Sequence, residues 1–272
     1  MGKLLRHLAI VNLFFAITSF ACGQTLASGQ ADLSLSPSPA PVPSPSPTTS
    51  TARSERSEPR VGIGVKGSFL GGGVEVAARA THRTNVRAGF DMFSYSRGFN
   101  KDSIAYKGQL NFKTVDAHYD IFPFAGKFHV SPGVLAYIGD PITATAAVPG
   151  GQSFSLGGKT YYSDATAPLT GNGKIKFNQV SPMATFGWGN LVPRNHGHFS
   201  VPVELGAVFQ GSPKATLNLA GNVCDSPGVN CRPVATDPTV QTNILSEQTK
   251  VNNSMSFFKV YPIISVGFGY SF

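Results

Sequence analysis

The sequence predicts an all-β fold: a closed antiparallel transmembrane β-barrel of eight strands, preceded by a disordered segment rich in Pro and Ser. Three observations predict it. Charged residues make up 13% of the 272 residues, about half of the ~25% that is usual in soluble domains. From residue 61 to 272, apolar side chains alternate with small or polar ones. Several alternating segments approach the ~9–11 residues that a tilted strand needs to cross a bilayer.

The first residues, 1–27, have the features of a secretory signal peptide, with a basic start, an apolar run and small residues after it. Cleavage after Gly23 or after Ala27 is compatible with the pattern. Cys22 raises the alternative of a lipid anchor, although the residues before it fit a lipidation motif poorly. No later apolar run reaches the ~18 residues of a spanning helix, so the sequence excludes a helical membrane protein.

Residues 28–60 form a linker in which proline occupies every second position from 37 to 47. Proline fixes φ and removes backbone donors, so we expect an extended, disordered segment close to polyproline II. Such a segment cannot build a core. We interpret it as a spacer, and a ligand for a domain of the SH3 type is the alternative.

The folded domain is expected at 61–272, and its last segment shows the pattern most clearly. Every second residue from 258 to 272 is apolar or aromatic, and most residues between them are small or polar. Alternation of this kind places one set of side chains on each face of a strand. The eight expected strands are 61–69, 73–81, 85–96, 104–121, 127–139, 174–189, 198–210 and 255–272.

Two local questions concern the strand register. Residues 61–81 can form two strands with a turn at Gly71–Gly73 or one long kinked strand, and an even strand number favours the turn. In residues 103–122 the apolar positions change phase, which predicts a β-bulge near Thr114.

The composition of the polar face decides which side meets water. It consists mostly of Gly, Ser and Thr with single charges, whereas a soluble sandwich, the alternative fold, should carry a heavily charged outer face. We therefore expect the apolar face to meet lipid, and a closed barrel is the sheet that leaves no edge unpaired there. Short connections (82–84, 122–126 and 190–197) are expected in the periplasm, and long ones (97–103, 140–173 and 211–254) outside the cell.

Single charges on the expected inward face have mixed signs, and unpaired charges in a narrow lumen would be costly. An eight-stranded barrel has room for side chains and little room for water. We therefore expect an interior ion-pair network, with a conductance or proton path as the alternative. The residues are Lys66, Glu75, Arg79, Arg87, Asp91, Asp116, Glu204 and Lys259.

Together these features resemble small Gram-negative outer-membrane barrels of the OmpA/OmpW-like type. The resemblance rests on the alternate aromatic residues at the end of the chain, Phe268, Tyr270 and Phe272, and on stretches 120–128, 181–190 and 205–213. It implies that the three aromatic residues form a C-terminal assembly signal. It also implies an outer-membrane location with the linker in the periplasm, and contacts with outer-membrane lipids and with the barrel assembly machinery.

Few residues suggest chemistry. Cys224 and Cys231 flank a Ser-Pro-Gly turn and predict a disulfide in an exported chain, and a metal site, the alternative, lacks a nearby histidine. His198 and Ser200, with Glu204, are similar to the residues of outer-membrane lipid A deacylases, but the acid follows closely and the histidine lies beside a periplasmic turn. No cofactor or metal is expected, and the scattered basic residues predict no nucleic-acid partner.

The sequence thus favours a non-enzymatic outer-membrane barrel with a structural or surface-interaction role. Its extracellular loops, 140–173 and 211–254, would be the contact surface, and their ligand is not specified by the sequence. The first alternative is a small passive channel or carrier for apolar solutes. The second is a lipid-modifying enzyme.

Overall fold

The computed structural model describes residues 60–124, 126–194 and 197–272. The predicted signal peptide and nearly all of the predicted linker lie outside the described residues. Eight antiparallel strands form a closed ring, since β4 pairs with β3 on one side and with β5 on the other. In ring order they are β1 (Val61–Ser68), β2 (Gly71–Thr81), β3 (Thr84–Lys101), β4 (Ile104–Ile121), β5 (Phe128–Tyr137), β10 (Val180–Trp188), β12 (Val203–Phe209) and β16 (Val260–Ser271).

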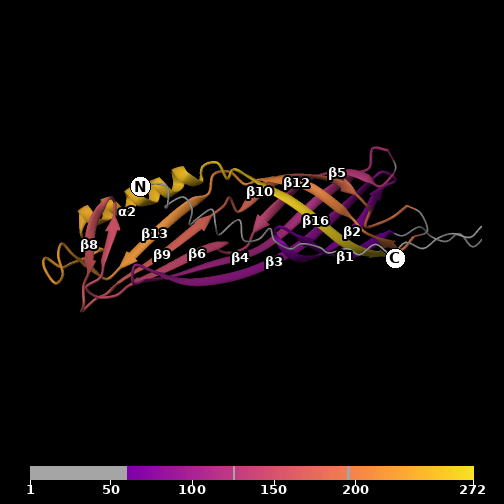
Figure 1. The fold of residues 1–272 in the computed structure, drawn as a ribbon. Coiled ribbons are helices and arrows are strands. Elements are labelled where there is room, and N and C mark those ends of the chain that lie inside the picture. The colour runs from indigo at the N-terminus through magenta and orange to yellow at the C-terminus, as the bar shows by residue number, and fades with distance from the viewer. Residues whose placement is uncertain (1–59, 125, 195–196) are drawn as a thin grey trace, which may run out of the picture. The chain divides into compact units, whose positions relative to one another are not determined.

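The predicted eight-stranded closed barrel is therefore confirmed (Figure 1). Closure runs through the first and last strands of the ring, because β1 pairs antiparallel with β16 and places Gly62 opposite Ser271. Residues 61–81 form two strands, β1 and β2, as the turn alternative required. A short strand, β11 (Phe199–Ser200), continues the wall beside β16.

The predicted bulge near Thr114 is wrong. β3 and β4 pair without a register shift from Thr84 opposite Ile121 to Lys101 opposite Ile104. Leu110 and Phe112 face the interior in the same phase as Asp116. The apparent phase change arises because the barrel interior is apolar toward the end where the β3–β4 turn lies. Apolar residues of β4 therefore lie on the inward face at that end.

Three long connections were expected as loops, and this expectation is wrong. At 97–103, β3 and β4 stay paired up to Lys101 and Ile104 and leave only a two-residue turn. The connections at 140–173 and 211–254 also hold regular structure. They contain β6 (Ile142–Val148), β9 (Leu169–Lys176) and β13 (Lys214–Ala220). These strands extend the sheet beyond the ring, because β6 pairs with residues 105–110 of β4. β9 and β10 are separate strands, and they replace the single strand predicted at 174–189. A second sheet consists of β7 (Ser153–Leu156), β8 (Lys159–Ser163), β14 (Asn222–Cys224) and β15 (Arg232–Pro233). We call the strands of these two connections (β6, β7, β8, β9, β13, β14 and β15), together with helix α2, the extension.

Helix α2 (Pro238–Met255) was not predicted, and it begins inside a segment expected to be a loop. Asp237 caps it by accepting a hydrogen bond from the Val240 amide at 2.8 Å. The helix also covers the free edge of β13, because the side chains of Gln248 and Asn252 accept hydrogen bonds from strand amides at 3.2 and 2.7 Å. Covering an edge in this way prevents pairing with another chain. No helix among the described residues is both long and apolar enough to cross a membrane.

The outer wall of the ring is apolar and exposed. On β16 every second residue from Val260 to Tyr270 faces outward, and the residues between them face inward. Large side chains remain open to the surroundings, with Trp188 59% exposed and Phe268 65% exposed. An apolar wall around a closed ring is the arrangement that a bilayer stabilises.

Candidate functional site

The interior of the barrel holds two groups of charged side chains in its middle section. In the first group, the Lys66 ammonium lies 2.8 Å from Asp116 and 3.1 Å from Asp91. His118 Nε2 lies 3.2 Å from the second oxygen of Asp116. The lysine side chain is 10% exposed and the carboxylates are almost fully buried, so one cation is shared by two acids out of contact with solvent.

The second group is centred on Arg87, whose side chain is 5% exposed. Its guanidinium lies 3.1 Å from Glu75, 3.1 Å from Asp120 and 2.6 Å from Glu204. Further donors satisfy these acids. His129 Nε2 lies 3.0 Å from Glu204, and the Ser131 and Thr185 hydroxyls donate to Asp120 and Glu204 at 2.7 and 3.4 Å.

The structure places seven of the eight charges predicted for the interior on inward-facing positions. Lys66, Glu75, Arg87, Asp91, Asp116 and Glu204 form the two groups. Arg79 lies nearer the rim where β1 begins, and its guanidinium donates to the Pro193 carbonyl at 3.2 Å. The eighth prediction is wrong, because Lys259 is exposed. Lys259 directly precedes Val260, the first residue of β16, and so lies outside the paired part of the strand.

Sequence reasoning omitted Asp120, His118 and His129 from the predicted network. The first two have the same parity as Asp116 on β4, and His129 lies on the inward face of β5. The strand alternation alone could therefore have identified all three. With them, the two groups contain five carboxylates, the two permanent cations Lys66 and Arg87, and two imidazoles.

Above the charged groups, the interior is apolar. Eight buried residues and their half-buried neighbours fill it (Leu70, Leu110, Phe112, Leu135, Tyr137, Met183, Val208 and Ile263, with Phe93, Ile142, Phe177 and Tyr261). Within this layer the Tyr137 hydroxyl donates to Gln210 at 2.7 Å. The expected polar lumen is thus correct only for the middle section.

Below the charged groups, the connection between β10 and β12 folds back into the barrel. Leu191 is 4% exposed and Val192 is fully buried. Gly64 and Gly269 face this segment. A Cβ atom on Gly269 would overlap the Leu191 side chain, and one on Gly64 would press tightly against it. The connection is therefore a plug, and the sequence prediction of a simple periplasmic turn missed it.

The residues considered for a lipid deacylase do not form one hydrogen-bonded unit. His198 Nδ1 lies 2.9 Å from the Ser271 carbonyl oxygen, and its ring stacks on Tyr270 at 5.6 Å between centroids. Glu204 is held instead by Arg87 and His129.

Near the end of β16, aromatic side chains gather on the outer wall. The ring of Tyr270 lies 4.9 Å from Phe272 and 5.1 Å from Phe199, and Phe128 lies 5.0 Å from Trp188. The proposed assembly-signal residues Phe268, Tyr270 and Phe272 thus stand at this outer rim. Aromatic rings prefer the interface between hydrocarbon and water.

The extension contains the disulfide that the sequence predicted between Cys224 and Cys231. Beside it, Arg232 lies 3.0 Å from Asp225 and contacts Asp237, the cap of α2. The hydrogen bonds from Arg232 hold the pKa of Asp225 below its ordinary value. The Val240 amide, helped by Arg232, lowers the pKa of Asp237. One arginine therefore links the disulfide loop to the helix.

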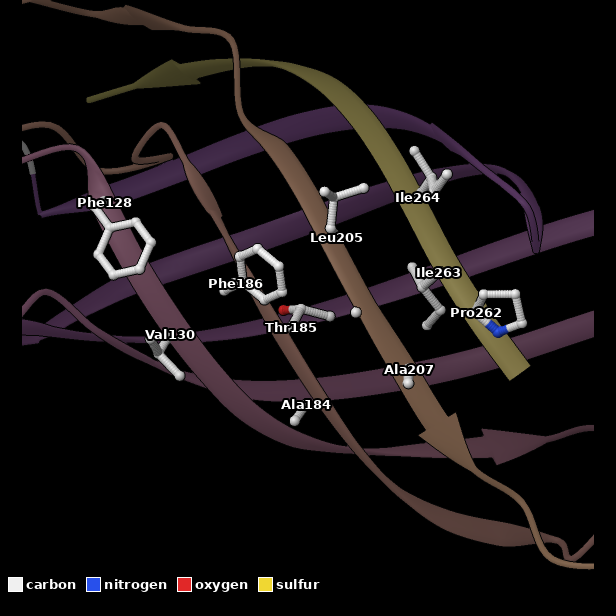
Figure 2. Close-up of a pocket in the computed structure, with 11 residues that line it drawn as sticks. Phe128, Val130, Ala184, Thr185, Phe186, Leu205, Ala207, Pro262, Ile263 and Ile264 are labelled. Atoms are coloured by element: carbon white, nitrogen blue, oxygen red, sulfur yellow. The ribbon is translucent and has the colours of Figure 1, made fainter. Parts of the chain in front are cut away.

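A hollow of about 660 Å³ opens on the outer wall (Figure 2). Its floor is formed by Ala184, Gly206 and Ala207 on β10 and β12. The larger side chains of Phe186 and Leu205 stand beside it, with further residues from β5 and β16 around the rim. The small residues create the hollow because β10 pairs Ala184 directly with Ala207.

Comparisons with known proteins give a distant likeness. No family model and no curated protein matches the chain. The solved structures that are similar to it include two proteins from one organism. The Acinetobacter baumannii protein CarO is 19% identical, with a TM-score of 0.46, and the match covers 78% of this chain and 98% of that one. A. baumannii CarO2 is also 19% identical with a TM-score of 0.46, and the match covers 79% of this chain and 100% of that one.

Proposed function

We propose that the protein is a Gram-negative outer-membrane barrel with a structural and surface-interaction role, and that it has no catalytic activity. The observation that carries the proposal is the inversion of the usual burial pattern. Large apolar side chains are exposed on the ring strands, while Glu75, Arg87 and Asp116 are buried within the ring. Water would disfavour both arrangements, and hydrocarbon around the wall would favour both.

The orientation follows from the connections. Both ends of the ring-forming chain lie at one rim, since the Arg60 amide donates to the Phe272 carbonyl at 3.0 Å. The extension lies at the other end of the strands. In barrels of this class the short turns and the chain ends are periplasmic, and the long connections are extracellular. The extension would therefore be the surface that meets partners outside the cell.

The filling of the lumen supports a closed barrel in preference to the passive channel. A solute path along the axis would have to pass the Leu191 plug, the charged groups and the apolar layer around Phe112. An eight-stranded ring offers little more than the volume that these side chains occupy.

Fractionation and electrophoresis test the proposal together. We expect the mature protein to occur in outer-membrane fractions and to migrate differently in gels before and after boiling. In planar bilayers we expect no stepwise ion conductance. A mature chain that stays folded in buffer without detergent would overturn the membrane location, and stepwise conductance that is altered by Arg87→Glu would support the channel instead.

A further inference from the structure

We propose that one outer face of the protein binds a phosphorylated glycolipid of the outer leaflet. The face consists of the β9–β13 pair and the β10–β12 pair that continues it toward the chain ends. The inference rests on the proposed membrane location. Along this face the chemistry changes from apolar to cationic to polar, in the order of acyl chains, phosphates and sugars in such a lipid.

The apolar part is the hollow on the outer wall in Figure 2. The outward pair Ala184 and Ala207 lies next to the outward pair Phe186 and Leu205 along the two strands, so the wall is locally grooved where the small side chains follow the bulky ones. A groove of this kind gives an acyl chain more van der Waals contacts than a smooth wall would.

The cationic part lies where β9 leads into β10 and β12 leads into β13. Residues 177–179 connect Lys176 to the start of β10, and residues 210–213 connect the end of β12 to Lys214. The register places the two lysines opposite each other, and both are exposed. Like charges in this position repel, so a shared anion would stabilise them.

The nearest acid neutralises only part of this charge. Asp140 lies 2.7 Å from the Lys174 ammonium and 3.4 Å from that of Lys176. Lys214 forms no ion pair with any residue that the structure describes. Three lysines and one carboxylate leave a net charge of about +2 at the level where the apolar wall ends. Phosphate groups of the outer leaflet are the complementary partner.

The polar part is a second hollow, of about 490 Å³, on the outer face of the extended sheet. Four side chains stand in direct register across β4, β6, β9 and β13: Lys107, Thr145, Asn172 and Asn218. The adjacent row is mostly alanine, which leaves the space open. Amide, hydroxyl and ammonium groups on a rigid sheet supply the donors and acceptors that sugar hydroxyls require.

Native mass spectrometry of the detergent-purified full-length protein tests the proposal, with lipopolysaccharide that lacks the O-antigen as the probe. Lys176→Ala with Lys214→Ala should weaken binding roughly thirtyfold, from the usual contribution of a basic residue near an anionic lipid surface. Lys101→Ala with Lys250→Ala removes the same charge from the β3–β4 tip and from α2, and it should leave binding unchanged. A dephosphorylated lipid of the same kind should fail to compete.

Binding by the Lys176/Lys214 variant at wild-type strength, or equal competition by the dephosphorylated lipid, would overturn the inference. Asn172→Ala with Asn218→Ala should abolish the preference for lipid that carries core sugars, and an unchanged preference would remove the sugar contact from the proposal. Each variant is first checked for heat-dependent gel migration. A correctly folded membrane barrel that fails these tests leaves the proposed function intact, whereas a wild-type chain that does not enter membranes overturns both.

Discussion

Replacement of Arg87 by methionine tests the interior network at its centre. The guanidinium contacts three carboxylates, those of Glu75, Asp120 and Glu204, at 2.6 to 3.1 Å, and all are nearly excluded from solvent. Methionine keeps most of the side-chain length and removes the charge. Three buried acids would then retain only His129 and the hydroxyl donors. Breaking a buried ion pair from one side costs about 3–5 kcal/mol, and we expect a loss of unfolding free energy in that range.

The assay is urea-induced unfolding in detergent micelles, followed by the fraction of protein with folded gel migration. Arg97→Met is the matched control, because Arg97 lies on the same strand and is exposed. An exposed substitution of this kind should change the unfolding free energy by less than about 0.5 kcal/mol.

A second background separates charge from packing. When Glu75, Asp120 and Glu204 are replaced by Gln, Asn and Gln, the Arg87→Met change should cost no more than about 1 kcal/mol, because no uncompensated acid remains. A neutral interior can be as stable as an ion-paired one. The reasoning would be refuted if Arg87→Met cost as much in this background as in the wild type, or if it cost less than about 1 kcal/mol in both.

Three further predictions concern the plug and the extension. Gly269→Val should displace Leu191 and lower the unfolding free energy by about 1–3 kcal/mol, whereas Gly72→Val, which points into open space, should not; equal effects would contradict the plug. Cys224→Ser with Cys231→Ser should destabilise the extension by about 2–3 kcal/mol for a loop with a separation of 7 residues. It should speed limited proteolysis there while the barrel keeps its gel migration, and unchanged proteolysis would contradict it. Arg232→Gln should raise the pKa of Asp225 toward its ordinary value, measured by carboxyl NMR. Because the folded-state pKa is the lower one, the stabilisation by this pair is present at neutral pH and is lost as the pH falls through that pKa.

The ring strands could be predicted because their two faces meet different surroundings. On β16 the exposed set and the inward set separate without exception from Ile263 to Ser271. The same separation identified the interior charges on β2 and β3 and Asp116 on β4. Where the surroundings on the two faces of a strand differ, a period of two in the sequence is enough to predict the strand and its inward face.

The extension could not be predicted in the same way. Helix α2 buries Val240, Ile244 and Met255 and leaves most of its other residues open, so no continuous apolar stripe marks it. The local signal was the cap, Asp237 followed by proline. β9 and β13 carry polar side chains on an exposed face and small or apolar ones on the other, and their short alternation was hidden among Gly, Thr and Asn.

The plug was missed for a related reason. Leu191 and Val192 are two apolar residues in a connection, which the sequence does not distinguish from an exposed turn. The signal was instead the pair of glycines at 64 and 269, which lie opposite each other on the paired strands β1 and β16. Inward glycines at one level of a narrow barrel leave a space, and packing requires that another segment fill it.

The three layers of the barrel interior, which are the apolar layer, the charged groups and the plug, support one another energetically. Ion pairs gain strength in a medium of low dielectric constant and lose it when water enters. The apolar layer around Phe112 keeps water from the charged groups on one side, and Leu191 and Val192 do so on the other. A conducting path would need both layers to open and would then weaken the pairs made by Arg87 and Lys66. The outer face of the extension needs no such change, because its lysines and amides are already exposed. Binding at that face therefore needs no opening of the interior, which supports the proposal that the protein acts through its outer face.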